Sequence, residues 1–556
     1  LAVNADSLNN RLGSVSSAGA LSVSSTGAVD NQGGELVTDA SFTLNSARLD
    51  NSQNGTLSST SALSITTGAF DNSHAGIVSS SDTLDINATK LINQSGGRLT
   101  SDKALTANIT GLDQQGGKLF SNTSVELDLN HGQLNNQSGL INGPRLMLKN
   151  LKDVNNQAGE ISSAQSFILA ADHLDNSGGK LLSHKALILR MNQALANVKG
   201  LISAQSIDGR AASLDNSGGT FSSRGDLLLN LDGQLSNHNQ GLISAADTLT
   251  LHSSGLNNNS GSVLGKSIAI DLGRATGDLN NAAGLIATDG LLTFEHLRDL
   301  NNQGGEISTA QRLTLNGRTL DNSSGKVISN NWLTLGGIRF INQGGLISGW
   351  QGLSVSGSDL DNRNQGTLSS RYGDVDVALS NSLLNRSAGA LVSQKNLSVR
   401  AANLDNSDKG ILSSAGEQTL NVTGLLNNVG GTVSAQQALS LIGTTLDNSG
   451  GSLIGNGDMT LDLLGALINT NGKLASAGGL LLNRASEINN QGGQLTSQGL
   501  LSLFAGSLDN RNRGTVAAND ALVVSTTGAV QNSSDGLIFS QRGDLNLKSA
   551  SLDNQA

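Results

Sequence analysis

One short phrase, close to Leu-Asp/Asn-Asn-x-x-Gly, recurs along the whole chain of 556 residues. It occurs 27 times, with successive copies 19 to 23 residues apart, and only the copy at Gln114 lacks the Asn. A period of about 20 residues sustained over a chain is typical of stacked repeats, in which each unit packs on its neighbours. We therefore expect one continuous repeat segment over residues 1–556 rather than several globular domains.

Each repeat carries apolar residues at fixed offsets from its Asn. In the copy at Asn176 these residues are Leu174, Leu181, Leu187 and Leu189. The last pair shows the alternation of a strand, and no stretch shows the stripe of an amphipathic helix. The pattern predicts an all-β fold, a right-handed parallel β-helix (β-solenoid). It would have about 27 coils of about 21 residues, with three short strands per coil.

The Asn and Gly residues of the phrase are expected to form the turns of the coils. Gly permits a positive φ or a close-packed turn, and Asn tolerates the left-handed conformation and bonds to its own turn. Asn side chains that stack in register can also bond to one another along the axis. The turn residues of three representative copies are Asn176, Gly178, Gly179, Asn216, Gly218, Gly219, Asn448, Gly450 and Gly451.

The residue before the repeat Asn is Asp in 12 copies. Consecutive copies both carry Asp only in the run Asp30, Asp50 and Asp71, and elsewhere a neutral residue tends to intervene. Two carboxylates one strand spacing apart repel each other. The alternation also indicates an ancestral unit of two coils.

Composition excludes several functional classes. The net charge of −10 is small for this length and is spread along the chain, which argues against nucleic acid or anionic lipid as the main partner. No run of 18 apolar residues is present, so no membrane-spanning helix is expected. Because Cys is absent, thiol catalysis, disulfides and Cys-ligated zinc are excluded.

We expect no cofactor, metal or catalytic site. The Gly-Gly-x-Gly core of calcium-binding β-helix repeats does not occur, and the seven His residues are scattered. A β-helical carbohydrate-active enzyme is a third alternative, because the column Asp30, Asp50 and Asp71 has the carboxylate spacing of glycoside hydrolases. These Asp residues occupy the ordinary repeat position, however, so the sequence indicates a protein that is not an enzyme.

Aromatic residues form the candidate binding patch. Trp332, Trp350 and Tyr372 are the only Trp and Tyr residues, and they fall within three adjacent repeats. Alternation places Trp332 on the outside, and the other two lie at turn-like offsets. The step of 23 residues from Asn362 to Asn385 should add a short loop near Tyr372. Outward aromatic residues beside Arg can stack on sugar rings or anchor a protein. The Arg residues assigned to this patch are Arg339, Arg363 and Arg371.

The phrases LDNSGGKLLS, NNQGGEIS, LDNSGGSLIG and INNQGGQLTS resemble the repeats of filamentous haemagglutinin and of CdiA-type contact-dependent inhibition proteins. The resemblance covers essentially the whole chain. It implies export through an outer-membrane two-partner-secretion transporter, followed by folding outside the cell. It also implies location at the surface of a Gram-negative bacterium or secretion from it.

From this resemblance we expect an extracellular shaft that carries a distal receptor-binding or toxin module for adhesion or contact-dependent inhibition. Both ends fall within repeats, so we expect an internal fragment of a longer exoprotein. The target-cell receptor or glycan would then be bound mainly by regions outside this segment. The alternative is an adhesin that binds glycans or cell-surface partners through its own lateral surface.

Overall fold

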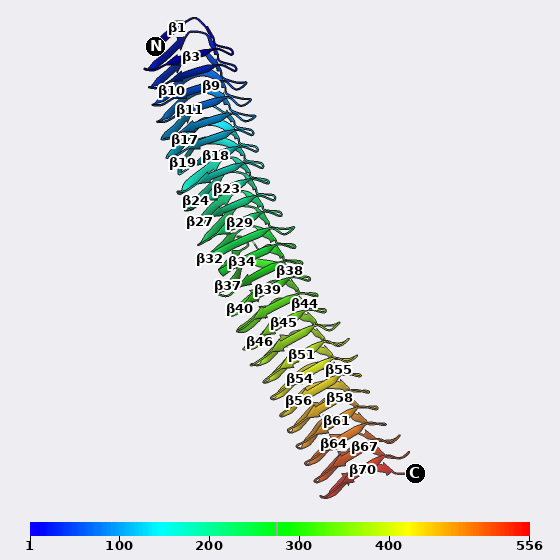
Figure 1. Ribbon diagram of the computed structural model, residues 1–556. Helices are drawn as coiled ribbons and strands as arrows, with labels where there is room; N and C mark the ends of the chain where they lie inside the picture. Colours follow the sequence, from blue (N-terminus) through cyan, green and yellow to red (C-terminus); the bar gives the residue numbers. More distant parts are fainter. Residues whose placement is uncertain (274–275, 556) are drawn as a thin grey trace. The chain divides into compact units, whose positions relative to one another are not determined.

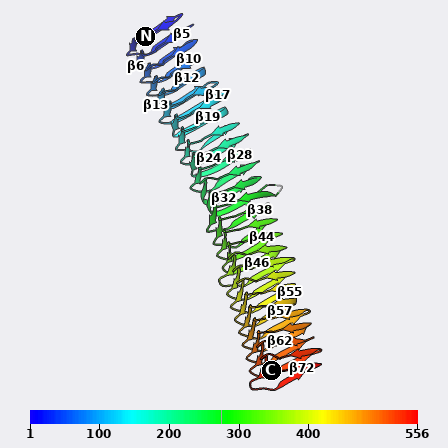
Figure 2. The same ribbon diagram turned by 90° about the vertical axis from the view of Figure 1, so that its right-hand side faces the viewer.

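The computed structural model describes residues 1–273 and 276–555. The chain divides into two compact units, Leu1–Gly277 (unit 1) and Asp278–Ala556 (unit 2), and each is a parallel β-solenoid. Within each unit, the strands of one coil lie beside the equivalent strands of the next coil (Figures 1 and 2). The described residues contain no helix, so none of them forms a helix long and apolar enough to cross a membrane. The predicted all-β repeat fold is confirmed.

A typical coil contains three short strands. In unit 1, β22 (His173–Asp175), β23 (Lys180–Ser183) and β24 (Ala186–Met191) follow one another. Unit 2 repeats this arrangement in β58 (Ser452–Gly455), β59 (Met459–Leu463) and β60 (Ala466–Ile468). In some coils two neighbouring strands merge, as in β17 (Ser124–Asn135), which pairs with both β14 (Ala104–Asn108) and β15 (Leu112–Asp113).

Strand pairing is parallel and advances by one repeat. β23 pairs on one side with β20 (Glu160–Ser163) and on the other with β26 (Leu201–Ala204). Leu181 lies opposite Ile161 and Ile202, so aliphatic side chains at equal offsets stack on one another inside the coils.

The core consists of the apolar offsets that the sequence predicts. Leu174, Leu181, Leu187 and Leu189 are all buried in the repeat at Asn176. Equivalent residues are also buried in the repeats at Asn216 and Asn448, namely Leu214, Phe221, Leu227, Leu229, Leu446, Leu453, Met459 and Leu461. Because neighbouring coils carry similar aliphatic residues, the interior is narrow and regular, and few aromatic side chains are needed to fill it.

The buried Asn of each repeat links successive coils through its side-chain amide. Asn176 accepts a hydrogen bond from Nδ2 of Asn156 and donates its own Nδ2 to Oδ1 of Asn197, each at 2.7 Å. Its Nδ2 also donates to the carbonyl of Gly179 in the same turn, at 3.3 Å. The resulting amide ladder continues through Asn216 in unit 1. Unit 2 has an equivalent ladder, which includes Asn448. Each of these Asn side chains thus bonds both to its own turn and to the next coil.

The amide ladder of unit 1 is interrupted at the repeat that lacks Asn. Gln114 still accepts a hydrogen bond from Asn93 through Oε1 at 2.8 Å, but its Nε2 donates to the carbonyl of Leu140 at 3.3 Å. Oδ1 of Asn136, in the next coil, is buried and has no hydrogen-bond partner. A buried acceptor without a partner costs about 1–3 kcal/mol, so this interruption locally weakens unit 1.

The two glycines of the turn are needed for different reasons. Gly178 has a φ of +65°, but Ala158 and Lys199 adopt the same left-handed conformation at the equivalent position. A Cβ on Gly179 would lie 2.0 Å from the carbonyl oxygen of Asn156 in the preceding coil. Close approach of two backbones therefore makes Gly179 the more constrained position. In the other representative turns, Gly218 and Gly450 have positive φ, whereas Gly219 and Gly451 are the glycines at the close approach.

Hydrogen bonds from Gln give a structural reason for the alternation of Asp with neutral residues. Nε2 of Gln303 donates to Oδ2 of Asp321 in the next coil at 2.7 Å, and Gln343 donates to Asp361 at the same distance. Asp321 also accepts the backbone N–H of Ser323 at 2.9 Å, which closes its own turn. A coil whose Gln donates is thus followed by a coil whose Asp accepts, which supports a repeat unit of two coils.

Candidate functional site

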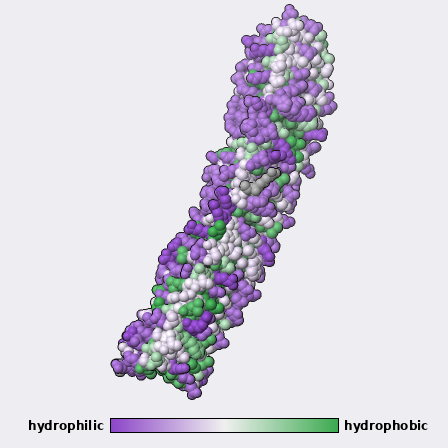
Figure 3. Space-filling model, turned by 180° about the vertical axis from the view of Figure 1, so that it is seen from behind, coloured by the Kyte–Doolittle hydropathy of each residue, from purple (hydrophilic) through white to green (hydrophobic). Residues whose placement is uncertain are grey.

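The candidate binding patch of unit 2 is spread over three consecutive coils. The face of the molecule in Figure 3 is mainly hydrophilic, with apolar residues in small groups. All Trp and Tyr residues of the chain, in contrast, are concentrated at this one place in unit 2. Trp332 begins β43 (Trp332–Gly336), and Trp350 follows β45 (Leu346–Gly349). Tyr372 follows β48 (Thr367–Ser370), in the next coil.

Trp350, Arg371 and Tyr372 form a compact cluster that we call the aromatic corner. The rings of Trp350 and Tyr372 have centroids 6.3 Å apart and an interplanar angle of 72°, an edge-to-face arrangement. Cζ of Arg371 lies 4.9 Å from the centroid of Trp350 and 5.4 Å from that of Tyr372. Both distances are typical of cation–π contacts.

The backbone holds the aromatic corner in place. The N–H of Tyr372 donates to the carbonyl of Trp350 at 2.7 Å, which ties the two connections together. Residues 371–374 connect β48 to β49 (Val375–Leu379), whereas only residues 350–351 connect β45 to β46 (Gly352–Gly357). The longer connection agrees with the extra loop that the 23-residue step predicts. A Cβ on Gly373 would lie 1.8 Å from the carbonyl oxygen of Gln351, so the loop turns where only Gly fits.

Trp332 is half-buried and lies against the next coil. Its backbone is in register with Gly352, and a Cβ on Gly352 would lie 2.2 Å from Cζ3 of the Trp332 ring. The missing side chain of Gly352 therefore leaves the space that the indole occupies. Trp332 packs on the strand that follows Trp350, which extends the aromatic surface to a third coil.

Arg339 and Arg363 do not join the aromatic corner. Arg363 binds Asp361 through Nε at 2.8 Å and Nη2 at 2.7 Å. The hydrogen bond to Asp361 raises the pKa of Arg363. Partial burial raises the pKa of Asp361, but hydrogen bonds from Arg363 and Gln343 outweigh this effect and hold that pKa below its usual value. Arg339 begins β44 (Arg339–Ile341), in register with Asp359. Of the three proposed Arg residues, only Arg371 therefore contacts the aromatic rings.

The carboxylates of Asp30, Asp50 and Asp71 form the column in register that the sequence predicts. Each accepts a backbone N–H of its own turn, at 2.9 to 3.2 Å. Arg11 also bonds to Asp30 at 2.6 Å, and Arg48 lies 3.7 Å from Asp50, so cations offset the repulsion between these carboxylates. Because each of these Asp side chains bonds to the backbone of its own turn, the column helps to shape the turns.

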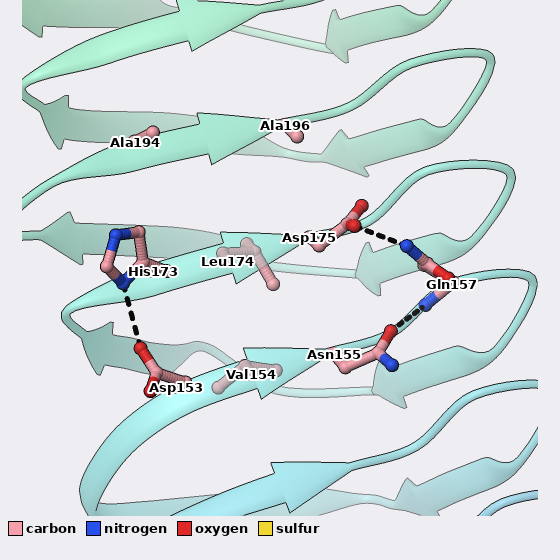
Figure 4. A pocket seen from close by; sticks show the side chains of 9 residues that line it. All are labelled: Asp153, Val154, Asn155, Gln157, His173, Leu174, Asp175, Ala194 and Ala196. Atoms are coloured by element: carbon pink, nitrogen blue, oxygen red, sulfur yellow. Dashed lines mark hydrogen bonds and ion pairs between the residues drawn. The ribbon is translucent and has the colours of Figure 1, made fainter.

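Unit 1 has a shallow depression of about 450 Å³ that the sequence does not reveal (Figure 4). Ala194 and Ala196 line the depression where neighbouring coils carry larger side chains. His173, which also lines the depression, points toward Asp153, and its Nδ1 lies 2.8 Å from Oδ1 of Asp153. The only sequence signal is this pair of Ala residues at offsets that carry polar groups in adjacent repeats, namely His173 and Asp175.

The polar groups around this depression bond to one another. Burial raises the pKa of Asp175, but hydrogen bonds from Ser177 and Gln157 outweigh it and lower that pKa overall. His173 and Asp153 bond to each other, as Gln157 and Asp175 do. The arrangement therefore resembles the ordinary side-chain pairing between coils more than a reaction centre.

Comparison with known proteins identifies a family. Eleven overlapping matches to the haemagglutinin repeat cover the whole chain. They span residues 1–88, 74–144, 126–205, 189–239, 225–293, 274–347, 339–371, 369–428, 413–470, 461–534 and 501–556. No curated protein and no solved structure matches the chain. Haemagglutinin repeats are typical of secreted and cell-surface exoproteins, with a structural, adhesin-like role. On these matches and the coil geometry, the chain belongs to the haemagglutinin-repeat family.

Proposed function

We propose that the chain is a section of an extracellular shaft in a longer exoprotein of a Gram-negative bacterium. The shaft is exported by a two-partner-secretion transporter and projects a distal receptor-binding or toxin module for adhesion or contact-dependent inhibition. The observation that supports this function most directly is the amide ladder. It joins coil to coil by the same buried bond in each unit, as expected of an element that holds a distal module at a distance from the cell.

An in-register deletion within unit 2 tests the shaft. Removal of residues 303–510 from the full-length exoprotein joins Asn302 to the turn that follows Asn510 and deletes ten repeat steps. At about 4.8 Å per coil, the distal module should move about 48 Å closer to the cell surface. Immunogold labelling should detect this shift, and the module should retain its activity toward accessible targets. Loss of that activity in a secreted, folded deletion variant would contradict the proposal.

The aromatic corner supports a second candidate, an adhesin that binds glycans or cell-surface partners through the side of the solenoid. An exposed Tyr372 ring and a half-buried Trp350 ring beside a guanidinium are suited to this role, since stacking needs an accessible face. The test is binding of the isolated chain to glycan arrays and target cells. Combined substitution Trp332→Ala and Trp350→Ala should abolish binding if the candidate is correct, and an unchanged signal would exclude these two residues as contacts.

A further inference from the structure

Arg371 differs from most other Arg residues on the surface of unit 2 in lacking a carboxylate partner. No described residue forms an ion pair with it, whereas Arg363 pairs with Asp361 and Arg484 with Asp462. Its guanidinium instead lies against Trp350 and Tyr372. A planar guanidinium on an aromatic surface keeps its edge donors available and pre-oriented, in the geometry that suits a carboxylate.

We propose that the aromatic corner binds a carboxylate-bearing sugar, with Arg371 on the carboxylate and Tyr372 against the sugar ring. The proposal rests on the lateral-binding candidate above and names its ligand class. Tyr372 is 51% exposed, and the backbone bond between Tyr372 and Trp350 holds the corner in one arrangement before a ligand arrives. Such preorganisation reduces the ordering cost of binding.

The surface extends along the solenoid for more than one sugar ring. Trp332, Trp350 and Tyr372 come from three consecutive coils. At about 4.8 Å per coil they cover about 10 Å, enough for an acidic ring and a neutral neighbour. Trp332 packs flat over Gly352, so the end of this surface is apolar and uncharged.

Charge favours a sparsely acidic sugar over a dense polyanion. The corner holds one guanidinium, and the net charge of the chain is −10. A nucleic acid or heavily sulfated polymer would need several cations along its path to replace its counterions. One carboxylate on an otherwise neutral oligosaccharide matches one unpaired Arg.

Intrinsic fluorescence offers a direct test. The substitution Trp332→Phe leaves Trp350 as the single Trp, so its emission reports on the aromatic corner. 3′-Sialyllactose, its carboxyl-reduced form and lactose are titrated separately into this single-Trp protein. We expect a saturable change with sialyllactose and at least tenfold weaker binding of the two neutral sugars. Arg371→Gln should remove this preference, while Arg210→Gln, an exposed strand Arg in unit 1, should leave it intact.

The outcomes separate this inference from the lateral-binding candidate. Equal binding of acidic and neutral sugars, unaffected by Arg371→Gln, would overturn the carboxylate assignment and leave lateral glycan binding standing. Absence of binding by all three sugars would overturn the carboxylate assignment, and if arrays and cells also give no signal the lateral-binding candidate fails with it. Circular dichroism of each variant verifies that the solenoid is folded.

Discussion

Gln114 and Asn136 occupy neighbouring positions of the amide ladder, yet Nε2 of Gln114 bonds to the carbonyl of Leu140 and leaves Oδ1 of Asn136 without a partner. At every other step described above, an Asn amide makes this bond at about 2.7 Å. One additional methylene group therefore breaks a bond that the rest of the ladder conserves.

Restoring the Asn at this position should strengthen unit 1. Gln114→Asn lets Nδ2 reach Oδ1 of Asn136, and we expect a gain of about 1–3 kcal/mol in local unfolding free energy. The exchange rates of the backbone amide hydrogens in the turn after Asn136 measure this gain. The reverse change, Asn176→Gln, should weaken protection of the turn at Asn197 by a similar amount. Faster exchange in Gln114→Asn would show that the ladder bond does not stabilise this turn.

Gln418 is a buried amide in an aliphatic column. It begins β55 (Gln418–Asn427), is 1% exposed and lies in register between Leu397 and Leu439, and neither Oε1 nor Nε2 has a hydrogen-bond partner. Gln418→Leu removes two unsatisfied polar atoms and should raise stability by about 1–3 kcal/mol. The thermal midpoint of unit 2 should rise. Leu482→Gln, which places a buried amide between Leu461 and Leu503, should lower it.

The two turn glycines should respond differently to Ala. Gly178→Ala places a side chain in a conformation that Ala158 already adopts, so the cost should be about 1–2 kcal/mol. Gly179→Ala forces a Cβ against the carbonyl of Asn156 and should cost several times more, because the two coils must separate. Thermal unfolding followed by circular dichroism compares the variants, and equal costs would contradict the distinction.

Acid below the ordinary carboxyl pKa of about 3.9 should destabilise unit 2 through its bonded carboxylates. The hydrogen bond from Arg511 holds the pKa of Asp509 below its usual value despite partial burial. The folded state therefore binds fewer protons than the unfolded chain near pH 4. The contribution of Asp509 is fully present above the ordinary carboxyl pKa of about 3.9 and is lost as the pH falls through the lowered pKa.

The substitution Asp509→Asn should make thermal stability less dependent on pH below about 4, while it retains an acceptor for the turn. Asp85→Asn, at an exposed strand position, is the matched control and should leave the pH profile near that of the parent. A profile unchanged by Asp509→Asn would indicate that this carboxylate makes no net contribution.

Sequence alone predicts the coil and its core because both repeat. Leu174, Leu181, Leu187 and Leu189 follow a pattern that 27 copies reinforce. The aromatic corner is predicted only in part, since proximity in sequence includes Arg363 but does not show that Asp361 binds it. Whether Oδ1 of Asn136 has a hydrogen-bond partner depends on the direction of the Gln114 side chain, which no periodic pattern specifies.

The amide ladder also has a direction. Nδ2 of each Asn points toward the following coil. During folding, the most recently formed coil therefore presents a free N–H donor, which bonds to the next Asn about 21 residues later. Each new bond closes a loop of one repeat, and the closure entropy does not grow with the length already assembled. A chain emerging amino-terminus first can therefore fold at a nearly constant rate per coil, with the last coil serving as template for the next.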